Sequence, residues 1–194
     1  MSVIGINGSP RADGNTARFV REVLAGAAEA GAETRMFHLG KMKIAPCIAC
    51  MECKKNAECA VRDDMQQIYD AIGSAREPKG LVLGTPIYFD HISAQMKTWI
   101  DRLYAYTFTE LGQKMFPEGF RAVLIATWEA GGEHAYDSVL SWLAGRMKGY
   151  HGIEVAEKLT LADTGRRPFE DRPDIIEHAR EVGRRLAVEE GRPS

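Results

Sequence analysis

The chain has 194 residues, of which 25 are Lys or Arg and 27 are Asp or Glu, so its formal charge is only −2 with the histidines neutral. Proteins that bind nucleic acid or anionic membrane surfaces normally carry a basic excess, which this chain lacks. Apolar residues make up 45% of the sequence and charged residues 27%, as in a folded domain and unlike a disordered chain. The length predicts that residues 1–194 form a single domain.

No stretch of the sequence approaches the roughly 20 apolar residues that cross a bilayer, so we expect no membrane association. The opening residues, MSVIGINGSPR, enter a strand-and-turn pattern directly and lack the layout of a signal peptide. We therefore expect a cytoplasmic protein. In a reducing compartment the four cysteines are not expected to form disulfides, and all of them fall between Cys47 and Cys59. This clustering indicates a metal or redox role.

Short apolar segments alternate with amphipathic ones along the chain. The pattern predicts strands at residues 3–7, 33–39, 80–85, 121–127 and 154–161, the third ending at Pro86. Helices are predicted at 16–30, from the Asp63–Asp64 pair to about residue 75, and at 93–104, 134–148 and 174–190. The segment 41–62, which carries the cysteines, shows no sustained period and is predicted to be an ordered loop.

This alternation predicts an α/β fold. Short strand-to-helix connections form right-handed crossovers, which place the strands parallel in one sheet with helices on both of its faces. The five strands fit the doubly wound order 2-1-3-4-5. Ligands of such sheets bind at the carboxyl ends of the strands, where the strand order reverses.

The loop after the first predicted strand, Gly8 to Thr16, reads GSPRADGNT. It leads into a helix N-terminus, where free backbone N–H groups and the helix dipole attract a phosphate. Ser9, Asn15 and Thr16 can add hydrogen-bond donors, and Arg11 can add charge. The loop has neither the ending of an ATP-binding Walker A loop nor the GxGxxG of a dinucleotide site. The alternative is that Asn15 or Thr16 is simply the cap of the helix.

These residues resemble a known family. GSPRxxGNT after the first strand is similar to the FMN phosphate loop of the flavodoxin-like NAD(P)H-dependent FMN reductases. GTPIYF at 84–89, SAQMK at 93–97 and DR at 101–102 resemble the second flavin loop of that family and the helix behind it, and DDM at 63–65 also matches. The likeness covers about the first half of the chain, and the second half matches in the order of its elements. It implies a flavodoxin-like fold with FMN as the cofactor.

The resemblance implies that Pro86, Ile87, Tyr88 and Phe89 line the isoalloxazine ring of FMN. Backbone amides would meet the polar edge of the ring, and the aromatic side chains its flat face. Ordinary packing at the end of a strand is the alternative for Tyr88 and Phe89.

The segment TWEAGG at 127–132 follows the fourth predicted strand. Thr127 and Gly131 are expected near the flavin, because glycine lets the backbone approach a ligand closely. This assignment depends on position more than on a motif. Trp128 is expected to pack in the core.

The four cysteines are closely spaced. Two residues separate Cys47 from Cys50 and Cys50 from Cys53, and five more precede Cys59. The first three match the run used by bacterial ferredoxins, whereas Cys59 departs from it and is followed by Ala60 instead of proline. The pattern resembles the compact cysteine motif of the iron–sulfur flavoproteins, a branch of the same FMN-binding family. The resemblance implies that the four thiolates ligate one [4Fe-4S] cluster.

Three alternatives for the cysteines stay open. A structural zinc site could use four thiolates, although such sites present two pairs separated by a longer stretch. A redox pair of Cys47 and Cys50 would leave Cys53 and Cys59 unexplained. Finally, related reductases can retain part of this loop without a cluster.

Three functions follow from these patterns. The first is an FMN-dependent electron-transfer oxidoreductase whose [4Fe-4S] cluster exchanges electrons with FMN. The second is a cluster-free NAD(P)H-dependent reductase of flavins or quinones. The third is a non-enzymatic FMN-binding or zinc-stabilised interaction module. In the first two the flavin carries the chemistry, so no catalytic side chain is expected.

The electron donor is expected to be NAD(P)H or a ferredoxin-like carrier, and the acceptor a small molecule. The resemblance also implies a homodimer or homotetramer. The connection from Tyr104 to Phe120 offers more apolar surface than a connection needs, namely at Tyr106, Phe108, Leu111, Met115 and Phe116.

Overall fold

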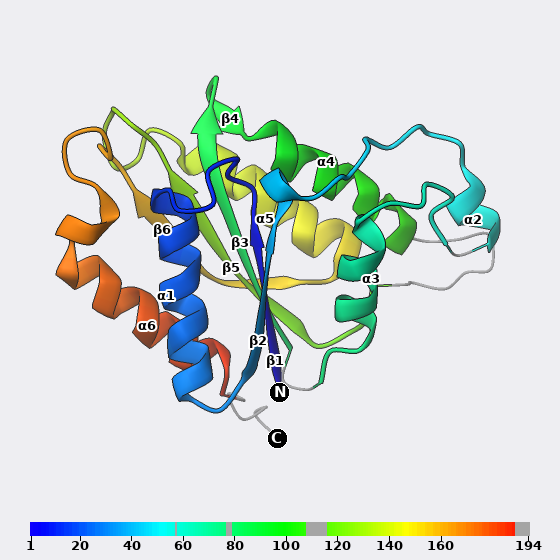
Figure 1. Ribbon diagram of the computed structural model, residues 1–194, viewed down its shortest axis with the longest axis horizontal. Coiled ribbons are helices and arrows are strands. Elements are labelled where there is room, and N and C mark those ends of the chain that lie inside the picture. The colour runs from blue at the N-terminus through cyan, green and yellow to red at the C-terminus, as the bar shows by residue number, and fades with distance from the viewer. Residues whose placement is uncertain (57, 77–78, 108–115, 189–194) are drawn as a thin grey trace.

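Parallel strands form the centre of the computed structural model, in the order β2-β1-β3-β5-β6 (Figure 1). The structure describes residues 1–56, 58–76, 79–107 and 116–188. Its strands are β1 Ser2–Asn7, β2 Glu33–His38, β3 Lys79–Tyr88, β4 His91–Ile92, β5 Phe120–Thr127 and β6 Glu154–Leu161. The short strand β4 pairs antiparallel with the end of β3. With this hairpin strand set aside, the predicted flavodoxin-like order 2-1-3-4-5 is confirmed.

Helices cover both faces of the sheet (Figure 1). One face carries α1 (Asn15–Glu29) and α6 (Pro173–Leu186), and the other carries α3 (Met65–Gly73), α4 (Ala94–Arg102) and α5 (Asp137–His151). Shorter helical turns are α2 Glu52–Asn56, η1 Leu39–Lys41, η2 Leu103–Tyr106 and η3 Phe169–Asp171. None of the helices in the described ranges is long and apolar enough to cross a membrane.

The alternation of side chains along β3 divides them between two cores. Val82 packs with residues of α1 and α6, whereas Leu81 and Leu83 pack with residues of α3, α4 and α5. All three side chains are fully buried. Because both faces of the strand are covered, its sequence is a continuous apolar run and not an alternating one.

Two predictions made from the sequence are wrong. β3 does not end at Pro86, because Ile87 and Tyr88 continue it by pairing with β4. The segment 41–62 is not loop throughout: it contains α2, whose five residues are too few to show helical periodicity.

The bounds of two helices also differ. α5 starts three residues later than predicted and continues to His151, where Gly152 ends it in the left-handed conformation with φ of 67°. α6 ends at Leu186, and the predicted end at residue 190 lies outside the described residues.

Two glycines let α1 and α6 meet backbone to backbone. A Cβ atom at Gly26 would lie 1.9 Å from the carbonyl oxygen of Arg180, and one at Gly183 would lie 1.9 Å from that of Val23. No side chain fits in such a contact. This close approach fixes the spacing of the two helices behind the first ligand-binding loop.

We expect Gly26→Ala to lower the free energy of unfolding by about 1–3 kcal/mol or more, because the added methyl group forces α1 and α6 apart. The matched control is Gly145→Ala in α5, where a Cβ meets nothing within 4 Å. This control should leave stability unchanged or raise it by up to about 1 kcal/mol. Urea unfolding measures both, and equal effects would contradict the helix contact.

Candidate functional site

A cleft of about 310 Å³ lies at the carboxyl ends of the parallel strands. The loops that follow β1, β3, β5 and β6 form its walls. This is the edge at which the strand order reverses between β1 and β3, and where open parallel sheets bind their ligands.

Eight of the ten residues predicted to contact the cofactor line this cleft: Ser9, Arg11, Asn15, Thr16, Pro86, Ile87, Tyr88 and Thr127. The other two do not line it. Phe89 is fully exposed at the hairpin turn and has a positive φ of 46°. Gly131 has a φ of 116°, a conformation that favours glycine.

The first wall of the cleft is the N-terminus of α1. Gly14 is its N-cap residue, no side chain among the described residues caps the helix, and its first turn holds no acidic residue. Asn15 and Thr16 lie within the helix, so the simple capping role considered from the sequence does not apply. The first N–H groups of α1 are therefore open to an anion in the cleft.

Hydrogen bonds hold the side chains of this wall in place. The Oδ1 atom of Asn15 accepts from the backbone N–H of Phe169 at 2.9 Å, so the Nδ2 group of the same amide remains as a donor. The Thr16 hydroxyl meets the Thr127 hydroxyl at 2.7 Å and joins α1 to the end of β5. The Ser9 hydroxyl accepts from the N–H of Arg11 at 3.1 Å.

Trp128 contributes a buried polar group to the cleft. Its side chain lines the cleft and is buried, as predicted, but its indole N–H has no acceptor among the residues that the structure describes. A buried N–H without a partner costs free energy. An acceptor on a bound ligand would remove this cost.

These features fit FMN. An open helix N-terminus and small hydroxyl and amide side chains suit a phosphate dianion, while Ile87, Tyr88 and Trp128 offer apolar surface for a flat ring with a polar edge.

Five further residues line the cleft: Gly14, Trp128, Glu129, Thr164 and Gly165. The first three lie in segments predicted to be near the cofactor, whereas the loop that carries Thr164 and Gly165 was not predicted. Thr164 and Gly165 follow the last strand, and the backbone N–H of Gly165 donates to the carbonyl of Glu129 at 3.1 Å. Their place at a carboxyl strand end was the available signal.

The cysteine segment, residues 41–62, leaves the sheet at η1 and extends alongside α4. Its helix α2 therefore lies far from α1 and α6 (Figure 1). Cys47 and Cys50 are exposed, Cys59 is half-buried and Cys53 is buried, and all four are free thiols. Burial raises the pKa of the Cys53 thiol. Within the described ranges, no three His, Cys, Asp or Glu side chains converge closely enough to hold a metal ion.

The chemistry of this donor set fits an iron–sulfur cluster, because four thiols lie on one short segment with none tied up in a disulfide. The backbone at Ala49 and Met51, on either side of Cys50, has positive φ values of 52° and 63°. Non-glycine residues adopt this conformation only where their surroundings impose it. Because no three of the cysteine side chains converge in the described ranges, the segment would have to close around a cluster.

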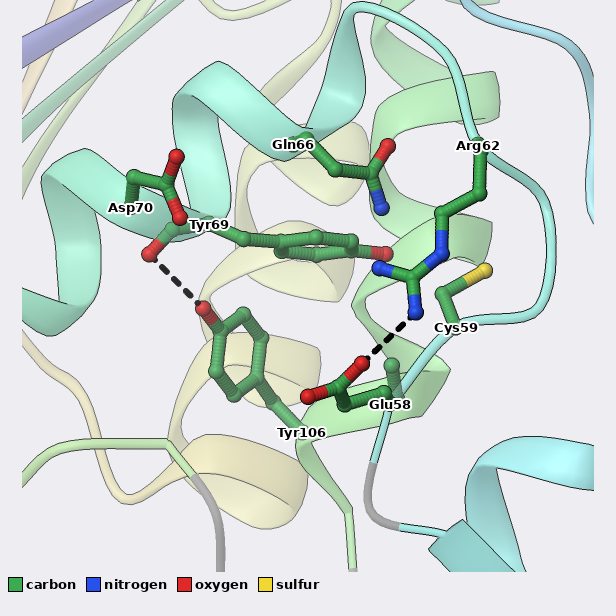
Figure 2. A pocket seen from close by; sticks show the side chains of 8 residues that line it. Glu58, Cys59, Arg62, Gln66, Tyr69, Asp70 and Tyr106 are labelled. Atoms are coloured by element: carbon green, nitrogen blue, oxygen red, sulfur yellow. Dashed lines mark hydrogen bonds and ion pairs between the residues drawn. The ribbon is translucent and has the colours of Figure 1, made fainter.

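A second pocket, of about 210 Å³, adjoins the cysteine segment (Figure 2). Cys59 lies at its rim beside Arg62, which pairs with Glu58 at 2.7 Å. The ring of Tyr69 forms one wall, and the Tyr106 hydroxyl donates to the Tyr69 carbonyl at 3.1 Å. Burial raises the pKa of both tyrosines, so their hydroxyls stay protonated at neutral pH.

Comparison with known proteins agrees with this geometry. Residues 1–160 match the NADPH-dependent FMN reductase family. An iron–sulfur flavoprotein of Methanocaldococcus jannaschii is 44% identical over 102 residues, which cover 53% of this chain and 51% of that protein. One from Methanosarcina thermophila is 34% identical over 102 residues, covering 53% of this chain and 52% of the relative. The alignments thus span about half the length of these curated relatives.

Among solved structures, an NAD(P)H:quinone oxidoreductase from Methanothermobacter marburgensis superposes with a TM-score of 0.76. It covers 100% of this chain and 99% of its own, at 20% sequence identity. At that identity the superposition shows a shared fold.

Proposed function

The chain belongs to the NADPH-dependent FMN reductase family, and from this premise we propose that it is an FMN-dependent oxidoreductase of the iron–sulfur flavoprotein kind. The observation that carries the proposal is the open N-terminus of α1 in a cleft that also holds the unpartnered indole N–H of Trp128.

Each wall of the cleft has a distinct role in this proposal. The backbone N–H groups at the start of α1, with Ser9, Asn15 and Thr16, bind the FMN phosphate. Ile87 and Tyr88 pack beside the isoalloxazine ring, and the indole N–H of Trp128 donates to a polar atom of the cofactor. The chemistry that bound FMN supplies is the acceptance of an electron pair and its release as single electrons.

FMN and riboflavin together test the phosphate assignment. We expect the chain to bind FMN at least about tenfold more tightly than riboflavin, because the phosphate contacts at α1 are lost without the dianion. Quenching of flavin fluorescence measures both affinities. Equal affinities would contradict a phosphate site at α1.

For the cysteine segment we propose that Cys47, Cys50, Cys53 and Cys59 ligate one [4Fe-4S] cluster. Four free thiols on one segment and the cysteine-motif resemblance to the iron–sulfur flavoproteins support this assignment. The chemistry that a bound cluster supplies is one-electron transfer.

A cluster-free NAD(P)H-dependent reductase of flavins or quinones is the second candidate. The observation that favours it is that the described thiols do not converge on one point. The two candidates differ in a single measurable property, which is the uptake of iron and sulfide under anaerobic conditions.

Electron donors and acceptors follow from the same proposal. NAD(P)H or a ferredoxin-like carrier would donate electrons, and a small molecule would accept them, because the cleft is small and opens to solvent. The clustered reduced thiols favour a cytoplasmic location.

We expect a homodimer or homotetramer in solution. Of the apolar residues singled out in the connection, Phe108, Leu111 and Met115 lie outside the described residues, while Tyr106 and Phe116 are buried in the core. Light scattering at micromolar concentration should give at least twice the chain mass of 21.5 kDa. A monomer would contradict the expectation.

A further inference from the structure

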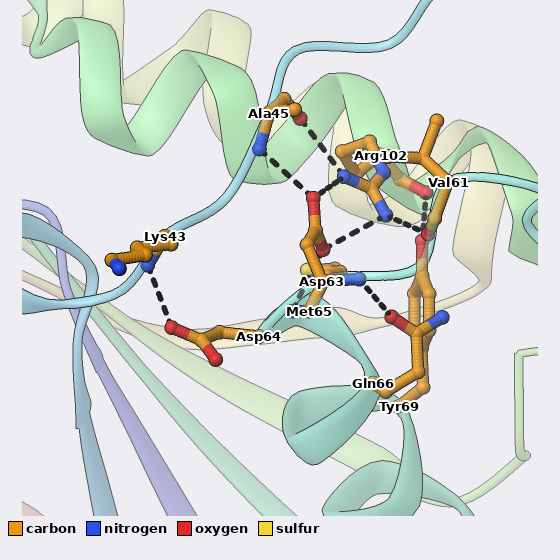
Figure 3. Close-up of polar contacts among 9 residues, drawn as sticks. All are labelled: Lys43, Ala45, Val61, Asp63, Asp64, Met65, Gln66, Tyr69 and Arg102. Atoms are coloured by element: carbon orange, nitrogen blue, oxygen red, sulfur yellow. Dashed lines mark hydrogen bonds and ion pairs between the residues drawn. The ribbon is translucent and has the colours of Figure 1, made fainter.

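One buried guanidinium group holds both ends of the cysteine segment (Figure 3). Arg102, at the C-terminus of α4, is 1% exposed. Its Nη1 atom donates to the carbonyl of Ala45 at 2.8 Å, two residues before the first cysteine. Its Nη2 atom donates to the carbonyl of Val61 at 3.0 Å, two residues after the last. The segment between these two points contains all four cysteines.

Asp63 completes this arrangement (Figure 3). Its carboxylate receives two hydrogen bonds from Arg102, at 2.7 and 3.2 Å. It also accepts from the backbone N–H groups of Ala45 at 2.9 Å and Met65 at 3.0 Å. Burial opposes the charged form, but these hydrogen bonds outweigh it and hold the pKa of Asp63 below its ordinary value. The carboxylate therefore stays charged at neutral pH. Through its bonds to Ala45 and Met65 it connects the chain that enters the cysteine segment with the chain that leaves it.

A second contact fixes the middle of the segment. Lys54 of α2 is buried, and its ammonium group donates to the carbonyl of Tyr104 at 2.6 Å and to the hydroxyl of Thr107. It also lies 3.7 Å from the centre of the Tyr104 ring. Because Tyr104 belongs to η2, which continues α4, the segment is anchored to one continuous support.

The same support reaches the cleft at its other end. The hydroxyl of Ser93, the N-cap residue of α4, donates to the carbonyl of Gly8 at 2.7 Å. Gly8 immediately precedes Ser9, the first residue of the loop that lines the cleft ahead of α1. Helix α4 thus connects the cleft, through Ser93, with the cysteine segment, through Arg102.

We propose that Asp63 and Arg102 are positioning residues that hold the two ends of the cysteine segment together, so that Cys47, Cys50, Cys53 and Cys59 can close around one cluster. This inference rests on the cluster proposed above. A buried ion pair adds little stability compared with apolar packing. Here, however, the remaining hydrogen bonds of the pair go to the backbone on either side of the cysteines. Joining the two ends lowers the entropy cost of closing the segment around a cluster.

The experiment compares Asp63→Asn and Arg102→Met with Glu181→Gln. Glu181 pairs with Arg185 at 3.1 Å on the exposed side of α6, far from α2, so its variant removes one carboxylate charge away from the segment. Trypsin cleavage of the cluster-free protein after Lys55 reports whether the segment is held, since Lys55 is exposed within it. Anaerobic reconstitution reports the uptake of iron and sulfide and the visible absorbance of the cluster. FMN titration reports whether the rest of the fold is intact.

We expect Asp63→Asn to speed cleavage after Lys55 by about tenfold or more, because the broken pair leaves a buried charge and opens the segment. Its uptake of iron and sulfide should fall by about tenfold or more, with loss of the visible band. FMN affinity should stay within about twofold of the wild-type value, and Glu181→Gln should match the wild type throughout. Arg102→Met should behave as Asp63→Asn does, and the milder Asp63→Asn carries the test if Arg102→Met does not fold.

Three results overturn the inference, and they are distinguishable. If the wild-type protein takes up no iron or sulfide, the proposed cluster itself is contradicted. If the wild type takes up iron and sulfide, and Asp63→Asn equals it in both cleavage and uptake, only the positioning role is contradicted. A parallel loss of FMN affinity in Asp63→Asn shows that the pair supports the whole fold instead of the segment.

Discussion

Replacing Asn15 by Asp should weaken FMN binding by at least about tenfold while the protein stays folded. The Oδ1 atom of Asn15 already accepts from the N–H of Phe169, and Asp keeps that acceptor. The change therefore replaces the Nδ2 donor by a second oxygen with negative charge, which repels a phosphate dianion. An acidic residue in the first turn of α1 favours the helix itself, so stability should not fall with affinity. Fluorescence titration with FMN measures the loss.

Two controls separate this local effect from a general one. Asn56→Asp adds the same charge in α2, away from the cleft, and should leave FMN affinity unchanged. Riboflavin, which lacks the phosphate, should bind the wild-type and Asn15→Asp proteins about equally. Unchanged FMN affinity in a folded Asn15→Asp protein would contradict a phosphate site at α1.

Replacing Cys50 by Ser should abolish or degrade the cluster while FMN binding remains. A serine hydroxyl stays protonated at neutral pH and is a poor ligand for iron compared with a thiolate. Cys50 is exposed and makes no disulfide, so its loss should not disturb the fold. Iron and sulfide per chain after anaerobic reconstitution, together with flavin reduction by a one-electron donor, measure the effect.

The matched control is Ile48→Ser, which introduces serine at an exposed position of the same segment without removing a thiol. It should take up iron and sulfide as the wild type does. A Cys50→Ser protein that equals the wild type in cluster content would contradict the ligand assignment.

Elements governed by local sequence pattern could be predicted. β6 lies at Glu154–Leu161, as predicted, and Gly31, just beyond the C-cap of α1, has a φ of 88°. Apolar periodicity and glycine caps carry this information within a few residues. The phosphate loop was recognisable for the same reason, because its residues are contiguous.

Features set by contacts between distant segments could not be predicted. The continuation of β3 past Pro86 depends on the hairpin with β4. The place of Trp128 in the cleft depends on the loop after β6, whose Thr164 N–H donates to the Trp128 carbonyl at 3.1 Å. Likewise, DDM at 63–65 and DR at 101–102 were separate motif matches, and only the fold shows that Asp63 and Arg102 form an ion pair.

The amounts of FMN, iron and sulfide in anaerobically purified protein test the central claim most directly. The account predicts about one FMN with about four iron and four sulfide atoms per chain, and a visible spectrum that combines flavin and cluster bands. Flavin without iron and sulfide after anaerobic reconstitution would contradict the cluster, as would zinc bound in place of iron. A chain that binds no FMN would contradict the account as a whole.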